Sequence, residues 1–419
     1  MPFPVRIVVP ASILAAIIVA SRPSAPTYSG QVAKILFDNC ASCHRPGEVA
    51  PFSLLSYEDA RKRAKTIAAV VQERVMPPWK AVHGYNNFLD ERRLTDEQIE
   101  ILKAWAEAGA PRGNVKAEPR PPTFASGWAL GAPDMVVAPE KEFHIGAEGR
   151  DIYRNFVVDS NFKETRWVKA IDVRPGNPRV VHHVIVFLDG KGRAAKLEAK
   201  NDDGQIGYDT FGGVGFAPDG SLGGWAPGLR PHMTPDGTAF EVPPGTSFVI
   251  QMHYHRDGKP ETDLTKIGLY FSKDAPKRTM QLAWIAQPFF RLRPGEVNQK
   301  VSLKWPVPVD VTAYAAMPHM HLLGKSMKAW VETQDGKTLP IIYVDDWNFN
   351  WQLTYAFKTP LKISAGSTVH VEAIYDNSKD NPRNPNDPPK PVGWGEQTTD
   401  EMMLLIVPFT IDGVSSFRK

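Results

Sequence analysis

The two cysteines of the chain stand together in Cys40-Ala41-Ser42-Cys43-His44. This is the C-x-x-C-H signature of covalent c-type haem attachment, in which two thiols bond the haem and the adjacent histidine binds its iron. A thioredoxin-like redox pair needs a βαβ context that the surrounding sequence lacks, and a zinc site needs further thiols or histidines nearby. The motif therefore predicts one covalent haem c.

The second axial ligand of the iron follows by elimination. Between His44 and residue 113 the only methionine is Met76, and the only other histidine is His83. Pro77 disfavours helix at the residue before it, so we expect Met76 to begin an extended segment that can fold over the haem. Because Met/His ligation raises the iron potential and suits electron transfer, Met76 is the predicted ligand. A core role for Met76, with His83 or no protein ligand at the iron, is the alternative.

Six further histidines form three clusters, His182-His183, His253-Tyr254-His255 and His319-Met320-His321. Histidines two residues apart project from one face of a strand toward a common point. Neutral imidazole binds copper, zinc, iron or nickel, and a thioether favours Cu(I). Since no cysteine or carboxylate adjoins these pairs, the clusters predict copper. His182 and His183 are adjacent, so a shared metal requires a strand end or a β-bulge there.

The elements that must position these residues divide the chain into three regions. Residues 30–113 have helical apolar spacing, and the third predicted helix begins with a capping box of Thr95 and Gln98 and ends at Gly109. Residues 114–133 are a Pro-rich linker. From residue 134 onward short alternating strands are separated by turn residues, which predicts two β-sandwiches at 134–275 and 276–419.

Both structured regions resemble known families. Residues 30–113 resemble a class I cytochrome c domain. Residues 134–410 resemble the copper type II, ascorbate-dependent monooxygenases, the family of the peptidylglycine α-hydroxylating and dopamine β-monooxygenases. The resemblance lies in the order and spacing of five stretches, 181–187, 224–228, 251–255, 318–325 and 399–402. Together these resemblances imply a multidomain fold: a small all-α cytochrome c domain followed by two all-β jelly-roll-like sandwich domains, each carrying one copper ion.

Carried over position by position, the resemblance implies two unlike copper sites. The first is held by His182, His183 and His253, and the second, which is catalytic, by His319, His321 and Met402. His255 is then not a ligand, although spacing alone pairs it with His253. Met403 is a rival to Met402, but the Asp-Glu-Met frame favours Met402.

The sequence departs from the animal enzymes in two respects. Those enzymes contain several disulfides, whereas here both cysteines belong to the haem motif, so core packing alone must hold the sandwiches. The peptide-amidating enzyme holds its substrate with an arginine, an asparagine and a tyrosine at positions that here are Met317, Leu404 and Ile406. The peptide carboxylate clamp is therefore absent, and we expect a different substrate.

The N-terminus and the composition bound the location and the partners. Met1–Arg6 carries one positive charge, Ile7–Ala20 is apolar and small residues follow, so residues 1–25 are a predicted signal peptide and the protein is expected to be periplasmic or secreted. An uncleaved anchor is the alternative, although no apolar run reaches the length of a secure membrane span. With 49 Lys and Arg against 46 Asp and Glu in 419 residues, the formal charge of +3 gives no electrostatic footprint for nucleic acid.

These inferences predict a copper-dependent monooxygenase fused to its own electron carrier. The family reaction, R–H + O2 + 2 e⁻ + 2 H⁺ → R–OH + H2O, hydroxylates a C–H bond of a small organic substrate. Where the family uses ascorbate, the fused haem is expected to pass on electrons from a cytochrome, a quinol-linked donor or an ascorbate-like reductant. A non-catalytic copper-binding or redox-sensing protein, and an oxidase of an inorganic or small nitrogen compound, are the alternatives.

Overall fold

The structure, a computed structural model, describes residues 25–48, 50–124 and 127–414. The predicted signal peptide, residues 1–25, lies almost entirely outside them. The helical elements are η1 (Tyr28–Val32), α1 (Ala33–Asn39), α2 (Tyr57–Lys62), α3 (Ala64–Gln72), α4 (Asp96–Glu107), η2 (Val115–Ala117) and α5 (Arg193–Glu198). Among the described residues, no helix is long and apolar enough to span a membrane.

The helices begin and end largely where their sequence signals predict. The Thr95 hydroxyl accepts from the N–H of Gln98, and the Gln98 side chain accepts from the N–H of Thr95, which confirms the capping box of α4. Gly109 follows this helix with φ of +80°, a conformation that glycine adopts without strain. The helical apolar spacing of residues 60–71 falls on two helices, α2 and α3, which meet at Arg63. Helices α1 to α4 share a small core around the fully buried Trp105.

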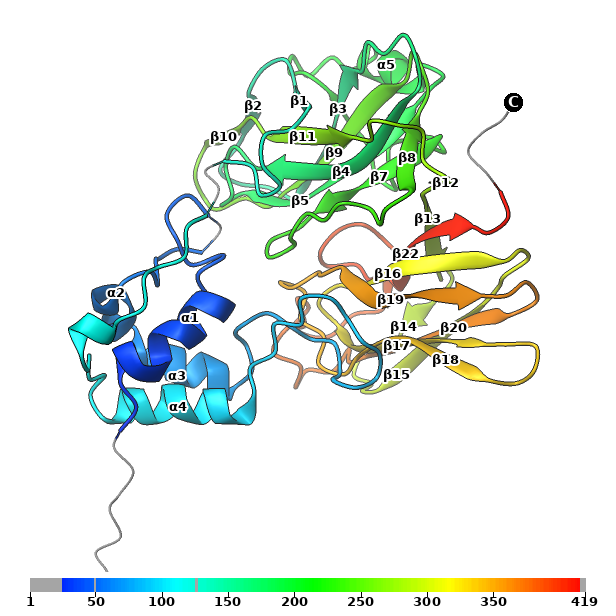
Figure 1. Cartoon of the computed structure of the whole chain (residues 1–419). Coiled ribbons are helices and arrows are strands. Elements are labelled where there is room, and N and C mark those ends of the chain that lie inside the picture. The colour runs from blue at the N-terminus through cyan, green and yellow to red at the C-terminus, as the bar shows by residue number, and fades with distance from the viewer. Residues whose placement is uncertain (1–24, 49, 125–126, 415–419) are drawn as a thin grey trace, which may run out of the picture.

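The predicted fold class, an all-α cytochrome c domain followed by two all-β jelly-roll-like sandwiches, is wrong. The described chain is mostly β-sheet with five short α-helices of 6–12 residues, which do not make a distinct all-α domain. The stretch between α3 and α4 leaves the helices and joins a β-sheet core, where Ala81 bridges Val344 and Phe88 bridges Phe357 (Figure 1). Although the helical spacing is expected to run through residues 30–113, Pro77-Pro78 in this stretch cannot donate backbone hydrogen bonds to a helix. The stretch is therefore extended and buries its apolar side chains against strands.

The Pro-rich linker is also held in place by contacts along its length. The N–H of Ala129 donates to Asp172 at 2.5 Å. The Arg45 guanidinium lies 4.2 Å from the centre of the Phe124 ring. The helical region is therefore joined to the β-sheets both before and after α4.

The first β unit consists of two five-stranded sheets and a two-stranded ribbon. Its strands are β1 (Met135–Val137), β2 (Phe143–Ile145), β3 (Ile152–Asp159), β4 (Arg166–Arg174), β5 (Val181–Asp189), β6 (Tyr208–Asp209), β7 (Gly220–Trp225), β8 (Thr238–Val242), β9 (Ser247–Tyr254), β10 (Glu261–Asp263), β11 (Lys266–Phe271) and β12 (Arg278–Thr279). The sheet orders are β1-β11-β4-β8-β12 and β6-β3-β9-β5-β7, and β10 pairs with β2. Both sheets contribute to one core, which includes Phe248, Ile250 and Met252 of the central strand β9.

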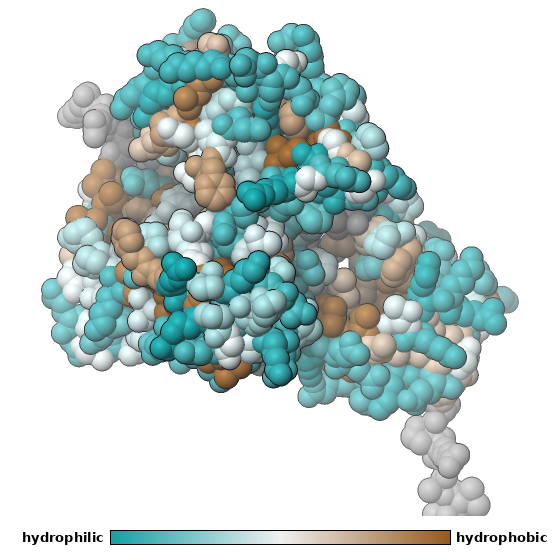
Figure 2. All heavy atoms as spheres, turned by 180° about the vertical axis from the view of Figure 1, so that it is seen from behind, coloured by the Kyte–Doolittle hydropathy of each residue, from teal (hydrophilic) through white to brown (hydrophobic). Residues whose placement is uncertain are grey.

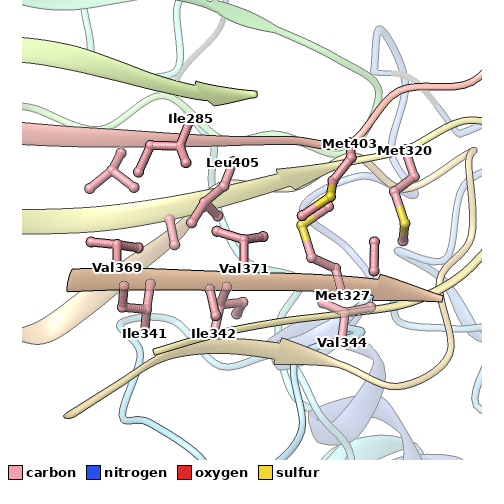
Figure 3. Packing of buried hydrophobic residues seen from close by; sticks show 14 of the residues in the cluster. Ile285, Met320, Met327, Ile341, Ile342, Val344, Val369, Val371, Met403 and Leu405 are labelled. Atoms are coloured by element: carbon pink, nitrogen blue, oxygen red, sulfur yellow. The ribbon is translucent and has the colours of Figure 1, made fainter. Parts of the chain in front are cut away.

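The second β unit pairs two four-stranded sheets. Its strands are β13 (Gln281–Ala286), β14 (Arg291–Leu292), β15 (Gln299–Pro306), β16 (Val311–His319), β17 (Gly324–Glu332), β18 (Thr338–Val344), β19 (Tyr355–Ile363), β20 (Thr368–Tyr375), β21 (Val392–Gly393) and β22 (Leu404–Ile411). The orders are β13-β22-β16-β19 and β15-β20-β17-β18, and β14 pairs with β21. Figure 3 shows Ile285 and Leu405 of the first sheet facing Val369 and Val371 of the second across the core.

The two β units contact each other through apolar and polar side chains. Phe187 of β5 stacks on Trp284 of β13, with ring centroids 5.9 Å apart. The N–H groups of Gly212 and Gly213 donate to the Glu396 carboxylate at 2.8 and 2.6 Å. The loop that leads to Met402 therefore docks on the first unit. Seen from behind, the mainly hydrophilic surface is hollowed where the helices meet the β units (Figure 2).

Candidate metal centres

Three imidazoles from two neighbouring strands converge in the first β unit. His182 and His183 lie at the start of β5 and His253 in β9, and one ligand atom from each lies within 4.8 Å of the other two. The Nδ1 atoms of His182 and His183 are 3.2 Å apart, and those of His183 and His253 are 3.3 Å apart. Two nitrogens bound to one metal at about 2.0–2.1 Å lie about 2.9–3.4 Å from each other. The three Nδ1 atoms therefore fit a single ion.

A β-bulge brings the two adjacent histidines to the same point. The register of β5 against β9 shifts between Val181 and His183, and His183 lies opposite His253. Consecutive residues of a regular strand point to opposite faces, and the bulge removes that restriction. The His182-His183 pair requires a strand end or a β-bulge, and the structure has the register shift of a bulge there. Burial lowers the pKa of His182 to about 3, so this imidazole is neutral at pH 7, as a metal ligand must be.

A carboxylate fixes the orientation of the third imidazole. Nε2 of His253 lies 2.9 Å from Asp151 Oδ2, so its Nδ1 faces the other two histidines. Asp151 also accepts from Thr398 Oγ1 at 2.7 Å, and it lies 3.0 Å from Nδ1 of His255. Burial alone raises the pKa of Asp151, but the hydrogen bonds from His253 and Thr398 outweigh it and hold this pKa below its usual range. The structure thus places His255 beside the orienting carboxylate and outside the three-histidine group.

Replacing Asp151 by asparagine is expected to weaken copper binding by the three-histidine group about 10- to 100-fold, the usual effect of losing an outer partner of a metal ligand. The amide keeps the size of the side chain but loses the charge that favours an N–H at Nε2 of His253. Competition with a copper chelator measures the affinity. Asp257→Asn, which changes an exposed carboxylate on the loop between β9 and β10, is the matched control. An affinity equal to that of the control would show that Asp151 does not orient His253.

The second pair of histidines lies at the end of β16. The rings of His319 and His321 are perpendicular, with centroids 5.2 Å apart, and both residues are buried. Met320 between them is fully buried in the core, so the two histidines share the opposite face. Nδ1 of His321 is 3.1 Å from the carbonyl of Asp400, which leaves Nε2 for a metal. Burial lowers the pKa of His319 to about 4 and holds that of His321 well below its usual value.

Two adjacent methionines differ in their surroundings. Met403 is 1% exposed and points into the core beside Met327 (Figure 3). Met402 is half-buried, and its carbonyl accepts from the Tyr375 hydroxyl at 2.8 Å. The register of β16 with β22 pairs His319 with Leu404, the residue that begins β22. Met402 and Met403 precede this pair, and only Met403 points into the core.

Glu401 ties the methionine segment to the histidine segment. Its fully buried carboxylate accepts from the backbone N–H groups of His321, Leu323 and Met402 at 2.9, 2.6 and 3.2 Å. Burial, opposed by these donors, raises the pKa of Glu401 to about 8. In the sequence, Glu401 is recognisable only as the middle residue of the Asp-Glu-Met frame. Its role depends on contacts across about 80 residues of chain.

The cysteine motif lies at the end of α1. Cys40 and Cys43 are free thiols, and Nδ1 of His44 lies 3.2 Å from the Phe52 carbonyl, which leaves its Nε2 available. Met76 is half-buried beyond the end of α3, whereas Nδ1 of the exposed His83 lies 2.9 Å from Glu91.

Comparison with known proteins bears on the second β unit. Residues 301–409 match the family model of the copper type II ascorbate-dependent monooxygenase, C-terminal domain. This match supports the copper monooxygenase family. The matched residues include His319, His321 and Met402, so they contain one of the two candidate ligand sets. The match supports copper as the metal and an oxidoreductase as the class of enzyme. No curated protein matches the chain.

Solved structures are similar only at a low level. The major capsid protein P2 from bacteriophage PM2 is 11% identical with a TM-score of 0.25, over 68% of this chain and 98% of that one. The Broad Bean Stain Virus structure is 9% identical with a TM-score of 0.27, over 69% and 90%. PNGF-II is 9% identical with a TM-score of 0.25, over 68% and 66%. Nothing in the assignment of the metal centres rests on these likenesses.

Proposed function

We propose that the chain is a copper-dependent monooxygenase that hydroxylates a C–H bond of a small organic substrate with O2. The convergence of three Nδ1 atoms, in a chain whose second β unit matches the copper monooxygenase family, carries this proposal. In it, His182, His183 and His253 hold one copper, and His319, His321 and Met402 hold the second, catalytic copper. The overall reaction consumes two electrons and two protons and forms R–OH and H2O.

Bound copper supplies one-electron redox chemistry and the activation of O2. The chain prepares both sites for it: the Met402 thioether favours the reduced ion, and burial keeps the imidazoles neutral. Asp151 and the Asp400 carbonyl each hold one ring in place. Met317 lies two residues before His319, and Leu404 is paired with His319, so both lie on the same strand face as His319. Both side chains are apolar, which favours an apolar small substrate over a peptide carboxylate.

The test is product analysis after a single exposure to oxygen. The copper-loaded protein is reduced without oxygen and mixed with 18O2 and a panel of apolar and polar small molecules. We expect one class of product heavier by one 18O atom, and no such product from protein loaded with zinc. If O2 consumption does not respond to any substrate while two coppers stay bound, the protein is a copper-binding or redox protein instead.

We further propose that a haem is bonded to Cys40 and Cys43, with His44 and Met76 as its axial ligands. Such a group is a one-electron carrier, and two electrons per turnover must arrive singly. The C-x-x-C-H motif and the contact of His44 Nδ1 with the Phe52 carbonyl, which leaves Nε2 as the ligand atom, support this proposal. The electron source is a cytochrome, a quinol-linked donor or an ascorbate-like reductant, and the predicted signal peptide suggests the periplasm or the cell exterior.

Replacing Met76 by alanine is expected to lower the haem reduction potential and to remove the weak long-wavelength sulfur-to-iron band, because thioether ligation raises the potential. Spectroelectrochemistry of the purified protein measures both. His83→Ala tests the rival ligand and should leave band and potential unchanged. The reverse pattern would assign His83 to the iron.

A further inference from the structure

One aromatic ring lies between the two histidine groups. Phe349 belongs to the segment Trp347–Gln352 between β18 and β19, called the bridge segment below, and is buried. Its ring stacks on that of His182, with centroids 4.9 Å apart and planes inclined by 18°. The same ring meets that of His321 nearly at right angles, at 5.7 Å and 82°. A single side chain therefore contacts one candidate ligand from each β unit.

The bridge segment is tied to the second histidine group by hydrogen bonds. Nε1 of Trp347 donates to the His321 carbonyl at 3.0 Å, and the Gln352 amide donates to the Phe349 carbonyl at 3.0 Å. The Gln352 side chain also hydrogen-bonds to His319. Trp347, Phe349 and Gln352 are 2%, 8% and 3% exposed, so these three side chains are buried, whereas Asn350 of the same segment is exposed. A shift of the Phe349 ring would therefore change its contacts with both histidines.

We propose that Phe349 is a positioning residue that couples the two copper sites, so that copper in one site orients an imidazole of the other. This inference rests on the proposed function because it needs both sites. A metal held by three Nδ1 atoms fixes the plane of His182, and the stacked Phe349 ring follows that plane. The edge contact then sets the position of His321. Two binding sites are coupled only if an interaction between them differs in free energy when one site is filled and when it is empty. The contacts of Phe349 are such an interaction.

A second link between the β units provides the rival route. The Thr398 hydroxyl donates to Asp151, which orients His253, and Thr398 lies four residues before Met402. Coupling through this hydrogen bond would not depend on Phe349. Thr398→Val removes the hydroxyl at nearly constant volume and separates the two routes.

The experiment measures Cu(I) affinity of the full-length protein by competition with a chelating dye. The Cu(I) dissociation constant of the three-histidine site is measured twice, once with the second site filled and once with the second site disabled by His319→Ala. The coupling factor is the ratio of these two constants. The corresponding ratio for the second site, with the first site disabled by His253→Ala, is expected to be similar, because coupling between two binding sites is reciprocal. We expect a factor of about 2- to 10-fold, the size of one aromatic contact, in the unmodified protein and in Thr398→Val.

Variants of the ring decide the outcome. In Phe349→Leu the factor should fall to one, while Phe349→Tyr, which keeps the ring, should retain it. Phe357→Leu removes a buried ring elsewhere in the same core and should retain the factor, which controls for general loosening. Three results would overturn the inference. The coupling factor could be one in the unmodified protein, it could persist in Phe349→Leu, or it could be lost in Thr398→Val. If two coppers bind tightly but the coupling factor is one, only this inference is wrong. If no copper binds, the proposed function is wrong as well.

Discussion

Replacing Met402 by isoleucine is expected to stop substrate hydroxylation, with turnover reduced by more than the about 10- to 100-fold typical of a lost outer partner. Isoleucine fills similar space but has no sulfur, so the second site loses the ligand that favours Cu(I). The three-histidine group lies in the other β unit and should stay loaded. Copper analysis, Cu(I) competition and product formation measure the three effects separately.

The neighbouring methionine is a closely matched control. Met403→Ile makes the same chemical change one residue later, but in the hydrophobic core, where a swap of similar volume usually costs less than about 1.5 kcal/mol. Turnover should be largely kept. If Met403→Ile stops turnover at full copper loading while Met402→Ile does not, the assignment of the ligand is wrong.

Replacing both Cys40 and Cys43 by alanine is expected to abolish reduction of the protein by a reduced cytochrome or a quinol-linked donor. Without the thiols no haem is covalently bound, so no group remains that can transfer single electrons from the donor to the copper sites. The histidine groups lie elsewhere in the fold, so the variant should still bind two coppers and turn over with ascorbate. Stopped-flow mixing with the donor and oxygen uptake with ascorbate measure the two activities.

The intact protein provides the complementary measurement. When haem-reduced, copper-oxidised protein is held without oxygen, the haem should become oxidised as the coppers are reduced. A haem that stays reduced over many turnover times would show that it does not feed the coppers. Deleting residues 1–114 is a poorer test, because Ala81 and Phe88 belong to the core of the second β unit and their loss would destabilise it.

The residues that carry the chemistry could be found in the sequence because their signals are local. The C-x-x-C-H motif, the histidine pairs and the capping box each occupy a few consecutive residues. A break in the regular strand at His182-His183, either a strand end or a bulge, could also be predicted, since the two-residue period of a strand does not let adjacent side chains meet at one metal. In these cases a short-range geometric rule connects spacing to structure.

Only the tertiary structure decided what depends on contacts between distant segments. Asp151 is 102 residues from His253, and Thr398 is 247 residues from Asp151, so no spacing rule could join them. Phe349 contacts both histidine groups only because the two β units meet at that point.

In the helical region, too, contacts between distant segments could not be predicted from the sequence. Its helices could be predicted from apolar spacing and capping, but the destination of the chain between α3 and α4 could not. Ala81 and Phe88 pack in a β-sheet core, where strands provide apolar surface and backbone partners. That surface forms only when strands from distant parts of the chain assemble.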